Sequence, residues 1–160
     1  MKMAKVIMTC GRLCSGKSTY AQKLAGEMNA VILSIDELMI TLFGHDAGDK
    51  HDYYAERVKK YLYGKSAELI GSGTNVVLDW GFWQKADRDI ARDFYGARDI
   101  PYEFHYINVS DEVWRQRIEK RNAEILAGMS DAYFVDDGLA EKFASMFDKP
   151  DKSEIDVWVE

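Results

Sequence analysis

Short apolar runs alternate along the chain with longer stretches in which apolar residues recur at every third or fourth position. An uninterrupted apolar run is typical of a strand buried on both faces, and the longer period is typical of a helix with one buried face. The predicted strands are Ala4–Cys10, Ala30–Ile35, Asn75–Trp80, Tyr102–Val109 and Glu154–Val159. The predicted helices are Lys17–Met28, Asp52–Ile70, Lys85–Tyr95, Asp111–Leu126 and Asp136–Phe147. This alternation predicts an α/β fold with a parallel sheet covered by helices on both faces.

The chain of 160 residues contains no repeat, linker or low-complexity segment, which predicts one domain over residues 1–160. No apolar run approaches the roughly 20 residues that span a bilayer, so no membrane segment is predicted. The stretch Met1–Gly11 has the lysines and apolar residues of a signal peptide but lacks a small-residue cleavage site, so we interpret it as a strand. Two cysteines make no disulfide framework, which favours a reducing cytoplasm.

The net charge of −6 comes from 21 basic and 27 acidic residues. Proteins that bind nucleic acid through counterion release usually carry a basic surplus. The charge therefore disfavours a large polyanionic partner, although it does not exclude a local basic patch on the surface.

The first predicted strand leads directly into the stretch CGRLCSGKSTYAQKLA, where Gly11, Gly16, Lys17 and Ser18 fit G-x-x-x-x-G-K-[ST]. Glycines let consecutive backbone N–H groups point at a phosphate, and the following helix adds the positive end of its dipole. Lys17 is a cation for the β- and γ-phosphates, and the Ser18 hydroxyl is a magnesium ligand. The predicted nucleotide-binding residues are Gly11, Arg12, Leu13, Cys14, Ser15, Gly16, Lys17, Ser18 and Thr19. Cys10 and Cys14 flank this loop as two small thiols or, alternatively, as a regulatory disulfide.

Two acids follow predicted strands. Asp79 ends an apolar strand, so it is either a carboxylate that holds magnesium through water or a cap of the next turn. Asp36 follows the second strand, so it either orients an attacking hydroxyl or caps the helix that begins with ELMITLF. Asp36 is also a further candidate metal ligand.

Arg117 and Arg121 are four residues apart, so both project from one helix face, and Arg115 lies off that face. These two arginines, followed by a Gly-containing stretch, suit a lid that closes over a triphosphate. The alternative is a solvated helix face on which the arginines pair with nearby glutamates. Arg88 is a candidate contact of the acceptor, or a partner of neighbouring aspartates.

Several aromatic residues and histidines are candidates for the acceptor side. Trp83 follows Asp79 within DWGFW and is either a wall of the cleft or part of the core, which we favour for these aromatics. His51 and Tyr53 lie in the polar segment Phe43–Tyr54, where a loop that closes on the acceptor is expected.

The sequence resembles the small P-loop kinases related to chloramphenicol phosphotransferase, zeta toxins, gluconate kinase and the kinase domain of polynucleotide kinase, an AAA-type ATP-binding group. The resemblance rests on the motifs GRLCSGKST, SIDEL, VVLDWGFWQKADRD, INVSDEVWRQRIEKRN and FDKPDKSEIDVWV and covers nearly the whole chain. It implies a nucleoside-monophosphate-kinase-like sheet of five parallel strands in the order 2-3-1-4-5, with a lid over about residues 117–135. It also implies ATP and Mg²⁺ as cofactors, Asp36 as the acceptor-side base, and Arg117 and Arg121 as phosphate contacts.

The sequence departs from the polynucleotide kinases, which carry an arginine shortly after the base. Here Leu38, Met39 and Ile40 follow Asp36, and the next arginine is Arg57. We therefore predict a kinase, monomeric or homodimeric, that phosphorylates a hydroxyl of a small molecule such as an antibiotic, sugar or nucleoside. The alternatives are a kinase for polynucleotide 5′-hydroxyls or nucleotides, and a noncatalytic ATP-binding switch.

Overall fold

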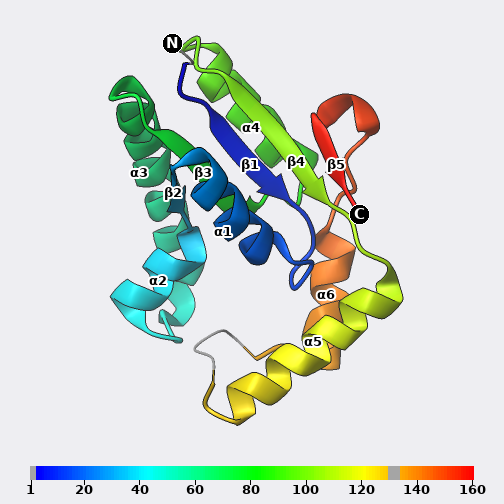
Figure 1. The fold of residues 1–160 in the computed structure, drawn as a ribbon. Coiled ribbons are helices and arrows are strands. Elements are labelled where there is room, and N and C mark those ends of the chain that lie inside the picture. The colour runs from blue at the N-terminus through cyan, green and yellow to red at the C-terminus, as the bar shows by residue number, and fades with distance from the viewer. Residues whose placement is uncertain (1–2, 130–133) are drawn as a thin grey trace.

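The computed structural model describes residues 3–129 and 134–160. Its centre is a five-stranded sheet in the order β2-β3-β1-β4-β5, and all four strand pairs are parallel (Figure 1). The strands are β1 Val6–Cys10, β2 Ala30–Leu33, β3 Asn75–Gly81, β4 Tyr102–Ile107 and β5 Val157–Val159. The predicted fold class and the strand order implied by the family resemblance are therefore confirmed.

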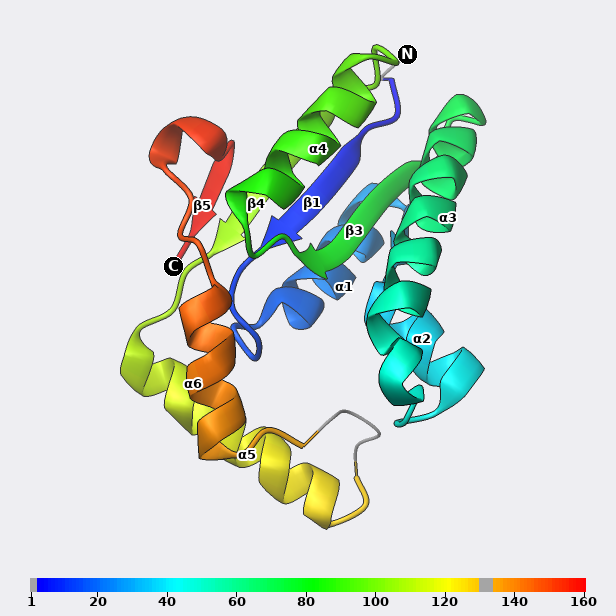
Figure 2. The ribbon, with the colours of Figure 1, turned by 180° about the vertical axis from the view of Figure 1, so that it is seen from behind.

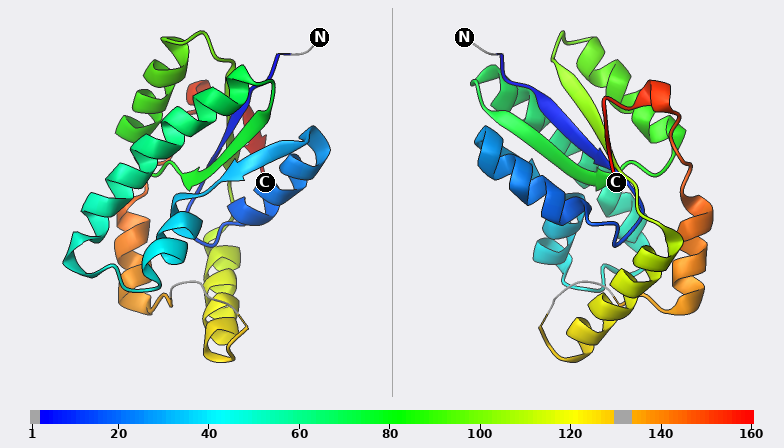
Figure 3. Two further views of the ribbon diagram at one scale, coloured as in Figure 1. Left: turned by 90° about the vertical axis from the view of Figure 1, so that its left-hand side faces the viewer. Right: turned by 45° about the vertical axis from the view of Figure 1, so that its right-hand side comes forward.

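Helices cover both faces of the sheet, as Figures 1 and 2 show from opposite sides. The α-helices are α1 Lys17–Met28, α2 Ile35–Phe43, α3 His51–Gly71, α4 Lys85–Gly96, α5 Asp111–Leu126 and α6 Asp137–Met146. Short 3-10 helices, η1 and η2, span Gly48–Lys50 and Lys152–Glu154. Helix α1 lies on one face, and α3 and α4 lie on the other. Helices α5 and α6 lie beyond the carboxyl ends of the strands (Figure 3).

The two faces of β1 contribute to two parts of the core, because successive side chains of a strand point to opposite faces. Val6 and Met8 pack with Tyr95 of α4, and Ile7 packs with Ala21 of α1. All five side chains are buried. Full burial of an aliphatic or aromatic side chain stabilises the fold by about 1.5–3 kcal/mol. This core holds the carboxyl edge of the sheet in place, where the candidate site lies.

Several predicted element boundaries differ from the structure by one to three residues, among them the end of the second strand and the start of the last. Strand β2 ends at Leu33, and Ser34 caps α2 by accepting a hydrogen bond from the Glu37 N–H at 3.2 Å. The helix thus begins before Asp36, and the interpretation of Asp36 as its cap is wrong. The last strand begins at Val157 instead of Glu154, because residues 152–154 form η2.

Other boundaries agree closely with the sequence-based expectation. Helices α1 and α5 have their predicted bounds, and the predicted cap Ser110 accepts a hydrogen bond from the Val113 N–H at 3.3 Å. The predicted lid begins within α5, and its residues 130–133 lie outside the described residues. Within the described ranges, no helix combines the length and apolar character needed to cross a membrane.

Candidate active site

A cleft of about 900 Å³ opens at the carboxyl edge of the sheet. Residues of the turn between β1 and α1 line its floor, residues of α2 line one side, and residues of α5 line another. The end of β3 contributes Asp79 and Trp80, and Trp83 follows directly. The cleft therefore lies where an α/β fold with parallel strands binds its ligands.

The turn between β1 and α1 has the backbone of a phosphate-binding loop. Gly16 lies in the left-handed region with φ +98°, and α1 begins at the next residue. Because Gly16 has no side chain to cap α1, the N–H groups of the first turn remain available to an anion. A Cβ on Gly11 would lie 2.8 Å from Ser15 Oγ and 3.0 Å from the Ile107 carbonyl oxygen, so a side chain does not fit there.

Lys17 lies on the floor of the cleft, and its Nζ donates to the Arg12 carbonyl oxygen at 3.1 Å. Burial lowers the pKa of Lys17 below its ordinary value, and the negative charges of Asp79 and Asp36 oppose that shift. A phosphate would act in the same direction as these carboxylates and favour the charged amine.

Ser18 and Asp79 are joined at the edge of the loop. The Ser18 hydroxyl donates to Asp79 Oδ2 at 2.7 Å, and the Thr9 hydroxyl donates to Asp79 Oδ1 at 3.0 Å. A hydroxyl and a carboxylate are the hard oxygen donors that Mg²⁺ prefers, so these residues fit the ion. Among the described residues no group of three or more His, Cys, Asp or Glu gathers into a metal site, so phosphate and water oxygens would complete the coordination.

Polar atoms without partners lie beside the same loop. Ser15 Oγ and Arg121 Nε are buried, and neither has a hydrogen-bond partner among the described residues. Arg121 Nη1 contacts Cys14 Sγ at 3.2 Å, and Arg117 Nη1 donates to the Ser15 carbonyl oxygen. A buried donor without an acceptor costs about 1–3 kcal/mol. Donors with unmet hydrogen bonds beside the loop therefore fit a phosphate.

Asp36 lies on the opposite side of the cleft from α5, in the first turn of α2. Its side chain is exposed, and Ile40 from the next turn lines the cleft beside it. Asp36 is therefore available to a ligand that enters between α2 and the loop.

The structure does not bring every candidate into the cleft. Arg88 is 1% exposed and binds Glu154, on the other side of the sheet from α1. His51 and Tyr53 lie at the start of α3, outside the residues that line the cleft. Arg12 turns out of the cleft, donates to Asp111 at 2.7 Å and stacks on Trp114. Leu13 to Thr19, by contrast, all line it.

Sequence reasoning missed some residues around the site. Thr9 holds Asp79, and the Trp114 indole N–H donates to the Leu13 carbonyl oxygen at 2.5 Å, which ties α5 to the loop. Glu124 also lines the cleft. Its position three residues after Arg121 on the same helix face was a signal for it.

The two cysteines do not form a disulfide bond with each other, and both are free. Burial raises the pKa of the Cys10 thiol to about 12, against the opposing effects of Arg88 and Lys17. The neutral thiol donates to the Phe82 carbonyl oxygen at 3.5 Å.

Comparison with solved structures identifies the same fold. A chain of the Pnkp1/Rnl/Hen1 RNA repair complex is similar with a TM-score of 0.73 and 21% identity, covering 91% of this chain and 44% of that chain. Kti12 of Chaetomium thermophilum in complex with ADP-AlF3 has a TM-score of 0.68 and 17% identity, covering 96% and 87%. The APS kinase CysC of Mycobacterium tuberculosis, in complex with AMPPNP and APS, has a TM-score of 0.69 and 18% identity, covering 99% and 89%. At these identities the likeness shows the fold, and this chain spans less than half of the first of these proteins.

No curated protein sequence matches the chain. A family model described as an AAA domain matches residues 6–149, which include the phosphate-binding loop, Asp36, Asp79, and the α5 residues Arg117 and Arg121. The chain therefore belongs to this AAA-domain family and has the P-loop fold that kinases share.

Proposed function

We propose that the protein is a phosphotransferase that uses ATP and Mg²⁺ to phosphorylate a hydroxyl group of a small molecule. The observation that carries this proposal is one cleft with a phosphate loop on its floor, Asp36 on one side and two arginines on the other. A nucleotide-binding protein without an acceptor would need the loop, but it would not need a carboxylate opposite the loop.

The loop and Lys17 would hold the β- and γ-phosphates. The free N–H groups at the start of α1 and the unpartnered Ser15 Oγ supply donors, and Lys17 supplies the charge. Ser18 would hold Mg²⁺ directly and Asp79 through water, and the ion would neutralise charge on the phosphate oxygens. Asp36 remains a further candidate ligand.

The acceptor would enter beside Asp36. The Asp36 carboxylate would accept the hydroxyl proton as the acceptor oxygen bonds to the γ-phosphorus and the bond between that phosphorus and the β-bridging oxygen breaks. ADP leaves with the electron pair of the broken bond. Arg117 and Arg121, on the loop side, would stabilise the charge on the transferred group.

The walls of the acceptor side favour an uncharged or cationic molecule. Ile40, Trp80 and Trp83 are large and apolar, and Asp36 supplies a carboxylate. The first arginine after Asp36 is Arg57, which lies outside this cleft. An antibiotic, sugar or nucleoside with a free hydroxyl fits these walls better than the end of a polynucleotide.

A second candidate is a polynucleotide kinase. The likeness to a chain of an RNA repair complex favours it. Both activities would use the same loop and the same carboxylate, and they differ only in the acceptor.

A panel of acceptors tests the proposal. ADP release would be measured with aminoglycosides, sugars, nucleosides and an oligonucleotide that carries a free 5′-hydroxyl. We expect a small molecule to stimulate release, and stimulation by the oligonucleotide alone would establish the second candidate. If no acceptor stimulates release although ATP binds, the protein is a switch and the proposal is wrong.

Asp36→Asn identifies the base in the same assay. We expect it to lower transfer by about 100- to 10,000-fold while ATP affinity changes little. Glu37→Gln is the matched control, because Glu37 is an exposed acid in the same helical turn that does not line the cleft. Equal effects of the two substitutions would contradict the role of Asp36.

A further inference from the structure

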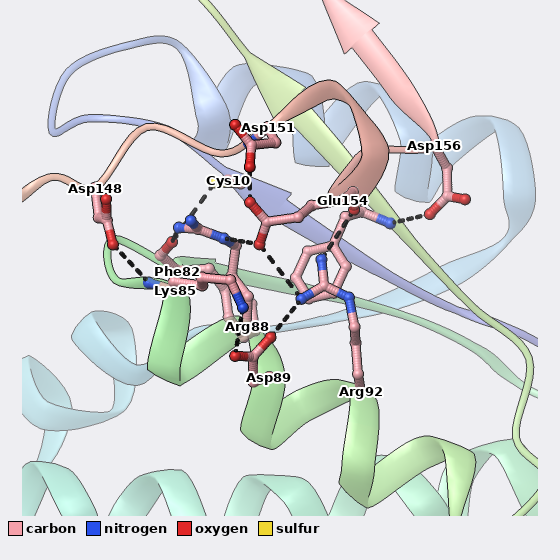
Figure 4. A network of polar contacts seen from close by, with 11 residues as sticks. Cys10, Phe82, Lys85, Arg88, Asp89, Arg92, Asp148, Asp151, Glu154 and Asp156 are labelled. Carbon is pink, nitrogen blue, oxygen red and sulfur yellow. Dashed lines mark hydrogen bonds and ion pairs between the residues drawn. The ribbon is translucent and has the colours of Figure 1, made fainter.

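Arg88 is a buried charge that the proposed function does not use. It is 1% exposed, its Nε donates to Glu154 Oε1 at 3.1 Å, and its Nη1 donates to the Phe82 carbonyl oxygen at 2.9 Å (Figure 4). Removing an ion pair from water costs several kcal/mol per ion, and a well-packed apolar pair is often equally stable. Stability alone is therefore a weak explanation for this arginine.

The Phe82 carbonyl belongs to an unusual turn at the end of β3. Met8 pairs with Leu78, and Cys10 pairs with Gly81, so β3 contains one residue more than β1 over this interval. Gly81 and Phe82 both have positive φ, +86° and +48°. The left-handed region costs a residue with a side chain about 1–2 kcal/mol, and a bulge re-aims the side chains that follow it.

Hydrogen bonds hold this turn against the phosphate loop. The Phe82 carbonyl oxygen accepts from Arg88 and from the Cys10 thiol, and the Gly81 carbonyl oxygen accepts from the Gly11 N–H at 3.0 Å. Among these contacts, the Arg88 bond is the charged one, and charge-assisted hydrogen bonds are about twice as strong as neutral ones.

Trp83 is the residue that the turn directs into the cleft. Its Nε1 lies 2.8 Å from the position of a Cβ on Gly81, and Lys17 Cε lies 3.5 Å from the same point. The indole N–H thus lies near the end of the Lys17 side chain. Within the described part of the chain it has no hydrogen-bond acceptor. The ring rests against Phe143 of α6, with centroids 5.2 Å apart.

We propose that Arg88 is a positioning residue that holds the Phe82 turn and thereby aims the Trp83 indole N–H at the phosphate or acceptor beside Lys17. The contact of Trp83 with a phosphate or acceptor rests on the proposed function, whereas the role of Arg88 in holding the Phe82 turn does not depend on it. Arginine suits the role because its planar guanidinium donates to Glu154 and to the Phe82 carbonyl oxygen at once. The single amine of a lysine does not reproduce this geometry. Arg88→Lys therefore keeps the charge opposite Glu154 but loosens the turn.

Arg92 provides a matched control on the same helix. Its Nη2 donates to the Glu154 carbonyl oxygen at 3.0 Å and its Nη1 lies 3.5 Å from Glu154 Oε1, so it shares the acid with Arg88. Within the described residues no hydrogen bond or ion pair joins it to Phe82, and its guanidinium lies over the Phe104 ring at 4.7 Å (Figure 4). Arg92→Lys should weaken the same network without moving the turn.

The conformational half is tested by ¹⁹F NMR of protein labelled with 5-fluorotryptophan. The chain has four tryptophans, and Trp83→Phe assigns the resonance of Trp83. We expect Arg88→Lys to shift or broaden that resonance, while Trp114 keeps its position and Arg92→Lys leaves Trp83 unchanged. If both lysine variants affect Trp83 equally, or neither does, the network is only structural and the inference is wrong.

The functional half is tested by a double-mutant cycle with Trp83→Phe. We expect Arg88→Lys to lower kcat/KM for transfer about tenfold in the wild-type background and less than about twofold with Phe at position 83, because residues that act through one contact are not additive. Additive losses would overturn the coupling. If the wild-type protein transfers no phosphate, the proposed function fails, and the NMR result still decides the role of Arg88.

Discussion

Gly16→Ala gives a quantitative test of the phosphate loop. Gly16 has φ +98°, a region in which a residue with a side chain loses about 1–2 kcal/mol. The new Cβ would lie 2.7 Å from Arg117 Nη1, closer than the usual 3.5–4.0 Å separation of nonbonded carbons. Because this atom ends a flexible side chain, Arg117 would move and lose its bond to the Ser15 carbonyl oxygen, which contributes about 1 kcal/mol.

Together these effects predict a loss of about 2–3 kcal/mol in the free energy of unfolding. For a chain of this length the melting temperature should fall by about 5–10 °C, measured by calorimetry. ATP affinity should fall as well, because the N–H groups of the loop and Arg117 would no longer converge on the phosphates.

Gly26→Ala is the internal comparison. Gly26 lies in α1, the helix that Gly16 precedes; it has no atom within 4 Å of a Cβ and no positive φ, so alanine should stabilise the fold by about 0.5–1 kcal/mol. If Gly16→Ala melts within about 2 °C of wild type, or if the two variants change stability alike, the reasoning about the loop is wrong.

Three further predictions concern charge and metal. Burial acts to raise the pKa of Glu154, but hydrogen bonds and attraction from nearby arginines outweigh it and hold that pKa below the ordinary value. Glu154 therefore stabilises the fold at pH values above its ordinary pKa, and this stabilisation is lost as the pH falls through its lowered pKa in the folded protein. Urea unfolding across acidic pH should show this loss of stability in wild type, and the contribution of Glu154 should be absent from Glu154→Gln. Arg117→Gln and Arg121→Gln should each slow transfer about tenfold or more in steady-state kinetics, whereas Arg115→Gln, off that face, should not. EDTA should abolish transfer, and Ser18→Ala should raise the Mg²⁺ concentration needed to restore it; metal-independent transfer would contradict the site.

The phosphate loop and the sheet could be predicted because their signals are local. The spacing of Gly11, Gly16, Lys17 and Ser18 specifies a backbone conformation, and apolar runs specify buried parallel strands. Strand order could not be obtained from spacing alone and came from the family resemblance.

The surroundings of the site depend on contacts between distant residues, which the sequence does not reveal. Arg88 looked like an acceptor contact, but its partner Glu154 is 66 residues away. The alternative was a pair with neighbouring aspartates, whereas the structure pairs Arg88 with Glu154 of the C-terminal segment and buries it. Ser34 and Asp36 are both residue types that cap helices, so the sequence alone does not choose between them. The structure selects Ser34, because β2 ends at Leu33 and the helix begins directly after Ser34.

The central claim is that the loop binds ATP, whose γ-phosphate is transferred to a hydroxyl beside Asp36. Calorimetric titration with Mg²⁺ and AMPPNP tests the nucleotide binding on which this claim depends. Wild-type protein and Asp36→Asn should bind with similar affinity, while Lys17→Ala should bind about 10- to 100-fold more weakly because it loses charged contacts to two phosphates. Absence of binding to wild type, or equal binding by Lys17→Ala, would contradict the account.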